Sequence, residues 1–158
     1  MAFDQREFRT ALGHFATGIT VVTACARNGD LLGVTVNSFN SVSLDPPLIL
    51  FSLERRSLSL SAFETAGNFA VNILGESQMN LSQNFARTQG DKWSGIAFDR
   101  WETGSPILKG SLAAFDCRTY AIHDGGDHRV FIGEVLRFEA QTEGTPLLYF
   151  RGSYTSLK

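Results

Sequence analysis

A succession of short strand-like segments separated by tight turns occupies the first third of the chain and limits the folds available to it. Residues 19–26 are rich in β-branched side chains, which favour strands. An Asn28-Gly29-Asp30 turn follows, with the Asn-Gly pair typical of hairpins. Segment 33–53 begins with an alternating run, reaches Asp45-Pro46-Pro47, and ends in the apolar residues 48–53. Short strands at this spacing predict a barrel or a sandwich.

The rest of the chain continues the same pattern, with helices only at intervals. Further strands are predicted at 68–74, 111–123, 128–138 and 146–150, and helices at 4–17, 57–64 and 77–85. In the first helix Phe8, Leu12 and Phe15 share one face, Asp4 is the expected N-cap and Gly18 the expected end. We therefore predict one mainly β domain over residues 1–158, an antiparallel barrel with peripheral helices.

The composition agrees with one globular domain that has a substantial apolar core. The chain has 158 residues, of which 43% are hydrophobic and 19% charged. Its 13 phenylalanines exceed what a core of this size demands, so some are expected at an interface or against a flat ligand. A net charge of −2 without a basic block argues against nucleic acid as a partner. No apolar stretch is long enough for a membrane span.

The N-terminus and the cysteines together predict a cytoplasmic protein. Residues 1–7 lack the basic start and apolar core of a signal peptide. Cys25 and Cys117 are far apart in sequence, and the missing export signal favours two reduced thiols, although a disulfide between them stays open. Cys117 lies inside a predicted strand and is interpreted as a core residue rather than a nucleophile.

Several familiar catalytic motifs are absent from the sequence. It has no P-loop, no Gly-x-Gly-x-x-Gly after a strand and no Gly-x-Ser-x-Gly elbow. The histidines, His14, His123 and His128, show no metal-binding spacing, so no metal site is predicted. His123 and His128 flank one turn, which leaves a two-histidine metal site as a minor alternative.

Two polar features suggest a ligand site, and each also has an ordinary structural explanation. Ser38, Asn40, Ser41 and Ser43 can hydrogen-bond a polar ligand, or can form a plain surface loop. The hydroxyl-rich first turn of the predicted helix 57–64, next to Arg55 and Arg56, can bind a phosphate, or can be a simple serine cap.

His128 is the third candidate, because it lies at the mouth of a predicted hairpin. A histidine there can donate to a ligand carbonyl or amide. Its neighbour Asp127 offers the alternative, a hairpin histidine bonded to an adjacent carboxylate.

Segment 35–47, Thr-Val-Asn-Ser-Phe-Asn-Ser-Val-Ser-Leu-Asp-Pro-Pro, resembles the central flavin-binding motif of the flavin reductase family. Gly126-Asp127-His128 is similar to the second motif of that family, and Asn84-Phe85-Ala86 and 151–154 match more weakly. The resemblance runs from Phe8 to Tyr154. Members are small NAD(P)H-dependent reductases that supply reduced flavin to two-component monooxygenases.

The resemblance implies a split β-barrel homodimer with flavin near the subunit interface. Thr35, Asn37 and Ser38 would contact the ring and ribityl chain, Ser57 and Ser59 the phosphate. The full implied flavin-binding set is Thr35, Val36, Asn37, Ser38, Ser52, Leu53, Ser57, Ser59, Phe85, Ala86 and Tyr154. His128 would lie near the nicotinamide as the catalytic residue, and Tyr154 would close the pocket.

The implied activity is hydride transfer from NADH or NADPH to FMN or FAD, with free flavin, NAD(P)H and an oxygenase component as partners. A split-barrel electron carrier that holds flavin is one alternative. A flavin-dependent reductase of a corrinoid or of ferric iron is another. The sequence leaves the choice of flavin and of nicotinamide cofactor open.

Overall fold

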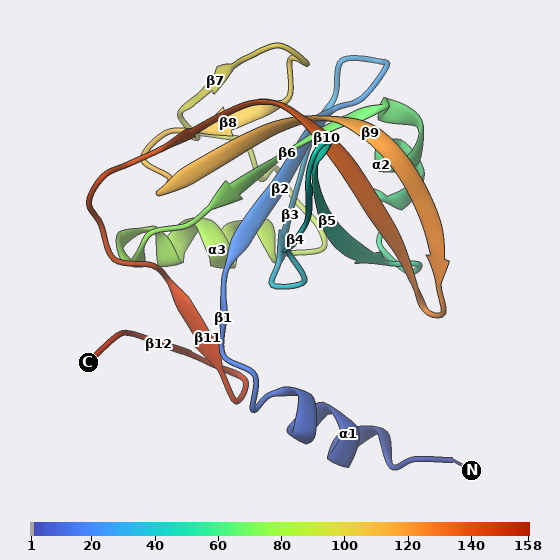
Figure 1. Ribbon diagram of the computed structural model, residues 1–158, viewed down its shortest axis with the longest axis vertical. Coiled ribbons are helices and arrows are strands. Elements are labelled where there is room, and N and C mark those ends of the chain that lie inside the picture. The colour runs from blue at the N-terminus through green and yellow to red at the C-terminus, as the bar shows by residue number, and fades with distance from the viewer. Residues whose placement is uncertain (1) are drawn as a thin grey trace.

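The structure is a computed structural model that describes residues 2–158, and antiparallel strands make up most of it (Figure 1). The main sheet has seven strands in the order β3-β2-β6-β9-β10-β5-β4. Their bounds are β2 Thr20–Cys25, β3 Leu31–Val36, β4 Asn40–Leu44, β5 Pro47–Glu54, β6 Asn68–Ile73, β9 Ala113–Gly125 and β10 His128–Ala140. Strands far apart in this order meet where Ser38, just after β3, bonds to Ser52 of β5. The sheet thus closes as a split antiparallel barrel, as predicted.

Two small sheets and four short helices surround the barrel. The strands β1 Thr17–Gly18, β11 Leu148–Phe150 and β12 Ser153–Thr155 form one sheet, and β7 Phe98–Arg100 and β8 Pro106–Leu108 form the other. The helices are α1 Gln5–Leu12, α2 Leu60–Ala66, the 3-10 turn η1 Glu76–Gln78 and α3 Met79–Phe85. None of the helices in residues 2–158 combines the length and apolar character that crossing a membrane requires.

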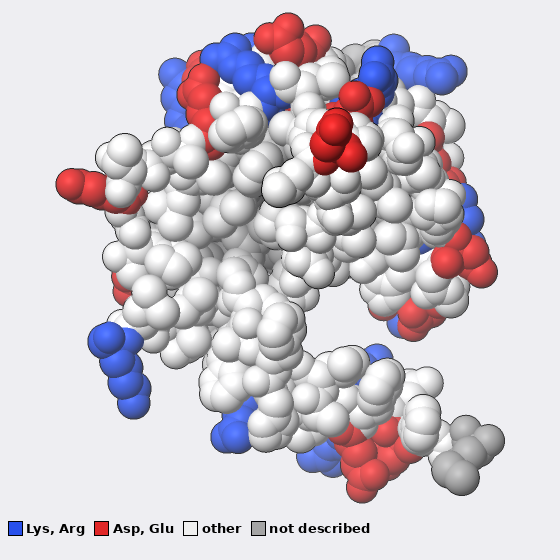
Figure 2. Space-filling view, viewed as in Figure 1, with Lys and Arg blue, Asp and Glu red and all other residues white. Residues whose placement is uncertain are grey.

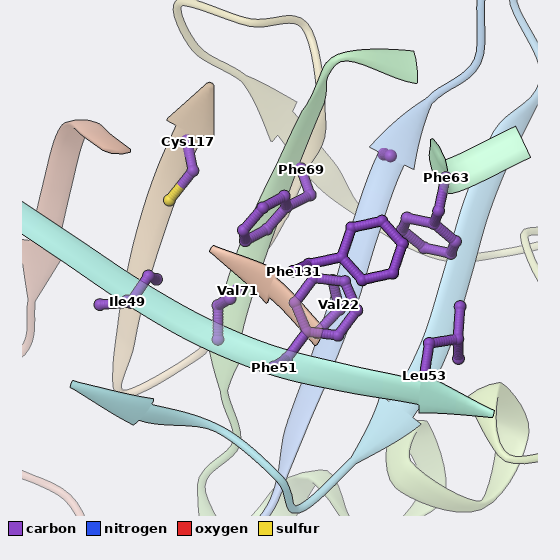
Figure 3. Close-up of a cluster of buried hydrophobic side chains, with 10 residues drawn as sticks. Val22, Ile49, Phe51, Leu53, Phe63, Phe69, Val71, Cys117 and Phe131 are labelled. Atoms are coloured by element: carbon purple, nitrogen blue, oxygen red, sulfur yellow. The ribbon is translucent and has the colours of Figure 1, made fainter. Parts of the chain in front are cut away.

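The barrel interior is filled mainly by phenylalanine rings (Figure 3). Phe51 of β5 stacks on Phe131 of β10, with ring centroids 4.8 Å apart, and meets the edge of Phe69 at 4.9 Å. A Cβ at Gly133 would overlap Cζ of Phe69 and lie 2.8 Å from Cβ of Cys117, so only glycine fits there. Cys117 is fully buried in the same cluster, and burial raises the pKa of its thiol. It is a core residue, as predicted.

The ends of several predicted elements were wrong. Helix α1 begins where expected, and Asp4 accepts hydrogen bonds from the backbone of Arg6 and Glu7. It ends at Leu12, however, so Gly13 rather than Gly18 follows its last turn.

Residues 40–44, interpreted as a polar patch, form strand β4, because pairing with β5 provides hydrogen bonds for their backbone groups despite the serines. Strand β12 was not predicted. Helix α2 begins at Leu60 rather than at Ser57.

Candidate active site

A cleft of about 400 Å³ opens beside the barrel, between strand β3, the end of β5, the end of α3 and the start of β10. Its volume lies within the range of small-molecule sites. The predicted site residues that line it are Thr35, Val36, Asn37, Ser38, Ser52, Leu53, Ser57, Ser59, Phe85, Ala86 and His128. The fold therefore brings together side chains from four distant segments of the sequence.

Strand β3 contributes a free backbone edge to the cleft. The strand is last in the sheet order, so only β2 pairs with it along one side. The hydroxyl of Thr20 on β2 donates to the Val36 carbonyl at 3.0 Å, whereas the Gly33 carbonyl is contacted from the other side of the strand by Lys92. Because backbone groups alternate along a strand, those of Gly33 and Thr35 face the free edge. A ligand that binds along this edge can therefore form hydrogen bonds with main-chain N–H and carbonyl groups.

The hydroxyls of Thr35 and Ser38 form hydrogen bonds between the elements that line the cleft. Thr35 Oγ1 donates to the Ser82 carbonyl at 2.6 Å, which holds β3 against α3. Ser38 Oγ accepts from the Ser52 amide at 3.0 Å and donates to the Ser52 carbonyl at 3.1 Å. The side-chain amide of Asn37 makes no hydrogen bond within residues 2–158. Of these three side chains, Asn37 is therefore the one best placed to bond a ligand.

One end of the cleft carries a serine cradle, which we define as Ser57 and Ser59. Their hydroxyls lie 3.1 Å apart, and both precede helix α2. Helix α2 begins at Leu60 with Ser59 as its N-cap, so both serines lie directly before the helix rather than in its first turn. The phosphate site expected there stays a prediction. Arg56 lines this end with a side chain that is 85% exposed, while Arg55 turns away to Asp124 and to the Gly126 carbonyl. This end of the cleft thus offers the two hydroxyls of the cradle and the guanidinium of Arg56, which lies 3.5 Å from Oε1 of Glu54.

His128 lies at the start of β10, opposite Glu54 of β5. Its Nδ1 is 2.7 Å from Oδ1 of Asp127, and this hydrogen bond lowers the pKa of the exposed Asp127 carboxyl. Asp127 therefore orients the ring and leaves Nε2 for a ligand in the cleft. His123 pairs with Val130 in the hairpin and is not part of the cleft lining. No cluster of three or more potential metal ligands occurs in residues 2–158.

Tyr154 lies outside the lining of the cleft. Its hydroxyl is 2.8 Å from Oγ of Ser82, the residue whose carbonyl accepts the Thr35 hydroxyl. The structure therefore places Tyr154 behind α3, where it holds the helix that carries Phe85.

Lys92 also lines the cleft and was not predicted. Its Nζ donates to the carbonyls of Gly33 at 3.2 Å and of Phe85 at 3.4 Å. Loss of solvent lowers the pKa of this ammonium, and the nearby Arg87 lowers it further. The sequence around it is an ordinary polar loop. The only available signal was the adjacent Trp93, whose ring packs 4.9 Å from that of Phe85 and fixes the loop.

Comparison with known proteins agrees with this arrangement. Residues 12–158 match the family model "Flavin reductase like domain". The chain is 43% identical over 157 residues to the flavin-dependent monooxygenase reductase subunit HsaB of Rhodococcus jostii, covering 99% of the chain and 80% of that protein. It is 47% identical over 156 residues to the FMN reductase (NADH) SmoA of Agrobacterium fabrum, covering 96% and 85%.

A solved structure shows the same fold with ligand fragments. The NADH:FAD oxidoreductase SgcE6 of Streptomyces globisporus, in complex with NAD and FAD fragments, superimposes with a TM-score of 0.92 at 30% identity. The match covers 98% of this chain and 93% of that one. A family match over nearly the whole chain, together with these identities, shows that the chain belongs to the flavin reductase family.

Proposed function

We propose that this protein is an NAD(P)H-dependent flavin reductase that takes oxidised flavin from solution and releases it reduced for a monooxygenase. The observation that carries the proposal is the cleft itself, where a free strand edge, a serine cradle and an oriented histidine meet. Membership of the family and the likeness to SmoA, HsaB and SgcE6 support it. Because the names of SmoA and SgcE6 specify NADH, we take NADH as the donor to test first.

The residues of the cleft fit a flavin. The pyrimidine edge of the isoalloxazine ring presents alternating acceptors and a donor, which suit the backbone groups of Thr35 and the amide of Asn37. Leu53 and Phe85 line the cleft from within the core, with exposed fractions of only 4% and 0%. Ser57 and Ser59 would hold the phosphate, and His128 would donate to the nicotinamide carboxamide. The flavin supplies the redox chemistry, accepting hydride from the nicotinamide, while the protein orients the two rings.

Removing both hydroxyls of the serine cradle is expected to weaken FMN binding. We predict that Ser57→Ala with Ser59→Ala raises the Kd for FMN roughly 100-fold or more, because hydrogen bonds to a charged group contribute about 1.5–3 kcal/mol each. Riboflavin, which lacks the phosphate, should bind both proteins equally. Fluorescence titration measures both constants. An unchanged Kd for FMN would contradict the assignment.

The reductase and the electron-carrier alternative differ in how they use free flavin. The purified protein should oxidise NADH rapidly only when FMN or FAD is added, as followed by absorbance. A yellow protein that does not oxidise NADH would instead indicate a carrier. Assays with ferric and corrinoid acceptors would identify the remaining alternative, because acceptor reduction would then exceed reduction of free flavin.

We further propose that the protein is a homodimer, because it exposes two apolar surfaces that one chain cannot cover. Helix α1 has no buried residue, and Phe8, Leu12 and Phe15 are 53%, 58% and 79% exposed. Figure 2 shows this N-terminal arm standing off from the body of the molecule. The second surface lies on the main sheet around Phe138, which is 67% exposed and stacks on Phe115. In a two-fold pair each arm can cover the sheet of the other copy.

The oligomeric state tests this proposal. Light scattering after size exclusion should give about twice the chain mass of 17.3 kDa. Phe8→Ser with Leu12→Ser should shift the protein toward the monomer, since it removes the apolar face of α1. Arg9→Ser, on the polar face of the same helix, is the matched control and should remain dimeric. A wild-type monomer at micromolar concentration would contradict the proposal.

A further inference from the structure

Lys92 is held at one corner of the cleft by backbone contacts from two walls. Its Nζ donates to Gly33 on the free edge of β3 and to Phe85 at the end of α3. The loop is fixed independently of this ammonium, because Asn84 Nδ2 donates to the Lys92 carbonyl at 2.7 Å and the Trp93 ring packs on Phe85. An ammonium has three donors, so one remains to point at a ligand.

This ammonium has no carboxylate partner among residues 2–158. The nearest acidic neighbour in sequence, Asp91, instead accepts hydrogen bonds from the backbone of Trp93 and Ser94. Arg87, which also lines the cleft, adds positive charge. A partly desolvated cation without a counter-ion gains most from an anion that arrives with the ligand.

The position of Lys92 along the strand indicates which part of a flavin it would meet. It binds the Gly33 carbonyl, two residues before Thr35, on the same free edge that we assign to the pyrimidine ring. The serine cradle, assigned to the phosphate, belongs to a different segment, between β5 and α2. When a flavin accepts hydride at N5, negative charge develops at N1 and the C2 carbonyl of the pyrimidine ring.

We propose that the ammonium of Lys92 stabilises the negative charge that the flavin ring gains on reduction, so that the cleft binds reduced flavin more tightly than oxidised flavin. The inference rests on the proposed flavin reductase function and adds a residue to it. The pKa of Lys92 is lowered by loss of solvent and by the nearby Arg87, as expected for a cation without a carboxylate partner.

The test compares riboflavin binding in its two redox states. The Kd of oxidised riboflavin is measured by fluorescence quenching, and that of reduced riboflavin by anaerobic titration. Lys92→Met keeps the length of the side chain but removes the charge. Lys92→Arg keeps the charge, and Lys109→Met removes an exposed lysine that is paired with Asp99 outside the cleft. Riboflavin is chosen because it has no phosphate.

The expected result is a change in the preference for reduced over oxidised riboflavin. We expect Lys92→Met to lower this preference roughly 10-fold, because the substitution removes one charge-assisted hydrogen bond. The two control variants should have a preference within about 2-fold of the wild-type value. If Lys92→Met weakened the binding of oxidised and reduced riboflavin equally, the proposal would be overturned, because a displaced loop would affect both redox states alike. Weaker FMN binding with unchanged riboflavin binding would overturn it too, since Lys92 would then contact the phosphate.

The proposed function and this inference fail in different ways. If the wild-type protein reduces flavin with NADH but Lys92→Met leaves the preference unchanged, only the role of Lys92 is lost. If the wild-type protein binds no flavin in either redox state, both proposals are overturned.

Discussion

Replacing His128 with alanine is expected to lower kcat/KM for NADH roughly 100-fold while the Kd for flavin changes by less than about 2-fold. The magnitude is that of losing one oriented donor at a reacting centre. The reason is positional, because Asp127 holds Nδ1 of this ring at 2.7 Å and leaves Nε2 toward the cleft. Stopped-flow absorbance gives the rate of flavin reduction, and fluorescence titration gives the Kd.

The hairpin supplies a matched control for this experiment. His123→Ala alters the other histidine beside the same turn, which lies outside the cleft lining, and should leave turnover unchanged. Asp127→Asn should cause a smaller loss than His128→Ala, because the ring stays in place but is held less firmly. Turnover by His128→Ala at the wild-type rate would remove His128 from the mechanism and leave it a hairpin residue bonded to Asp127.

Replacing Phe131 with alanine is expected to lower the free energy of unfolding by about 3–5 kcal/mol. The ring is fully buried, stacks on Phe51 with centroids 4.8 Å apart, and lies 6.4 Å from the ring of Phe63 (Figure 3). The neighbouring strands cannot collapse onto the space that it leaves, because they are held by the sheet hydrogen bonds on both sides of β10. Urea denaturation at fixed protein concentration measures the change.

An exposed apolar side chain gives the comparison for this substitution. Leu157→Ala removes part of a side chain that is 63% exposed, so it should change the free energy of unfolding by less than about 0.5 kcal/mol. If Phe131→Ala were as mild as Leu157→Ala, the stacked phenylalanine cluster would not be the main source of stability in the barrel.

Much of the barrel could be predicted because its signals are local. The β-branched run before Asn28-Gly29 became β2 and its hairpin, and the turn before His128 joined β9 to β10 as expected. The prediction of the site residues rested more on the resemblance to a family than on physical arguments from the sequence. Serines 57 and 59 line the cleft at the N-terminus of α2, but the helix begins at Leu60 rather than at Ser57, so the predicted start of the helix was wrong and the phosphate site stays a prediction.

The errors share one physical cause, which is that tertiary contacts decide what local sequence leaves undecided. Residues 40–44 are poor strand formers by composition, yet pairing with β5 makes them a strand. Phe8, Leu12 and Phe15 show the spacing of a buried helix face, but each of them is more than half exposed. Lys92 could not be found from its own segment, because its contacts with Gly33 and Phe85 exist only after folding.

The origin of the cleft in four distant segments has a consequence for the handling of this protein. Residues 34–38, 52–59, 85–92 and 128 meet only in the folded chain, so a denatured chain has no affinity for the ligand that the cleft holds. A ligand bound in the cleft therefore raises the free energy of unfolding, by about 2.7 kcal/mol when the free ligand concentration is 100 times its Kd. An enzyme that releases its product into solution loses this stabilisation each time the cleft empties. We therefore expect the melting temperature of the protein to rise with the concentration of flavin in the buffer.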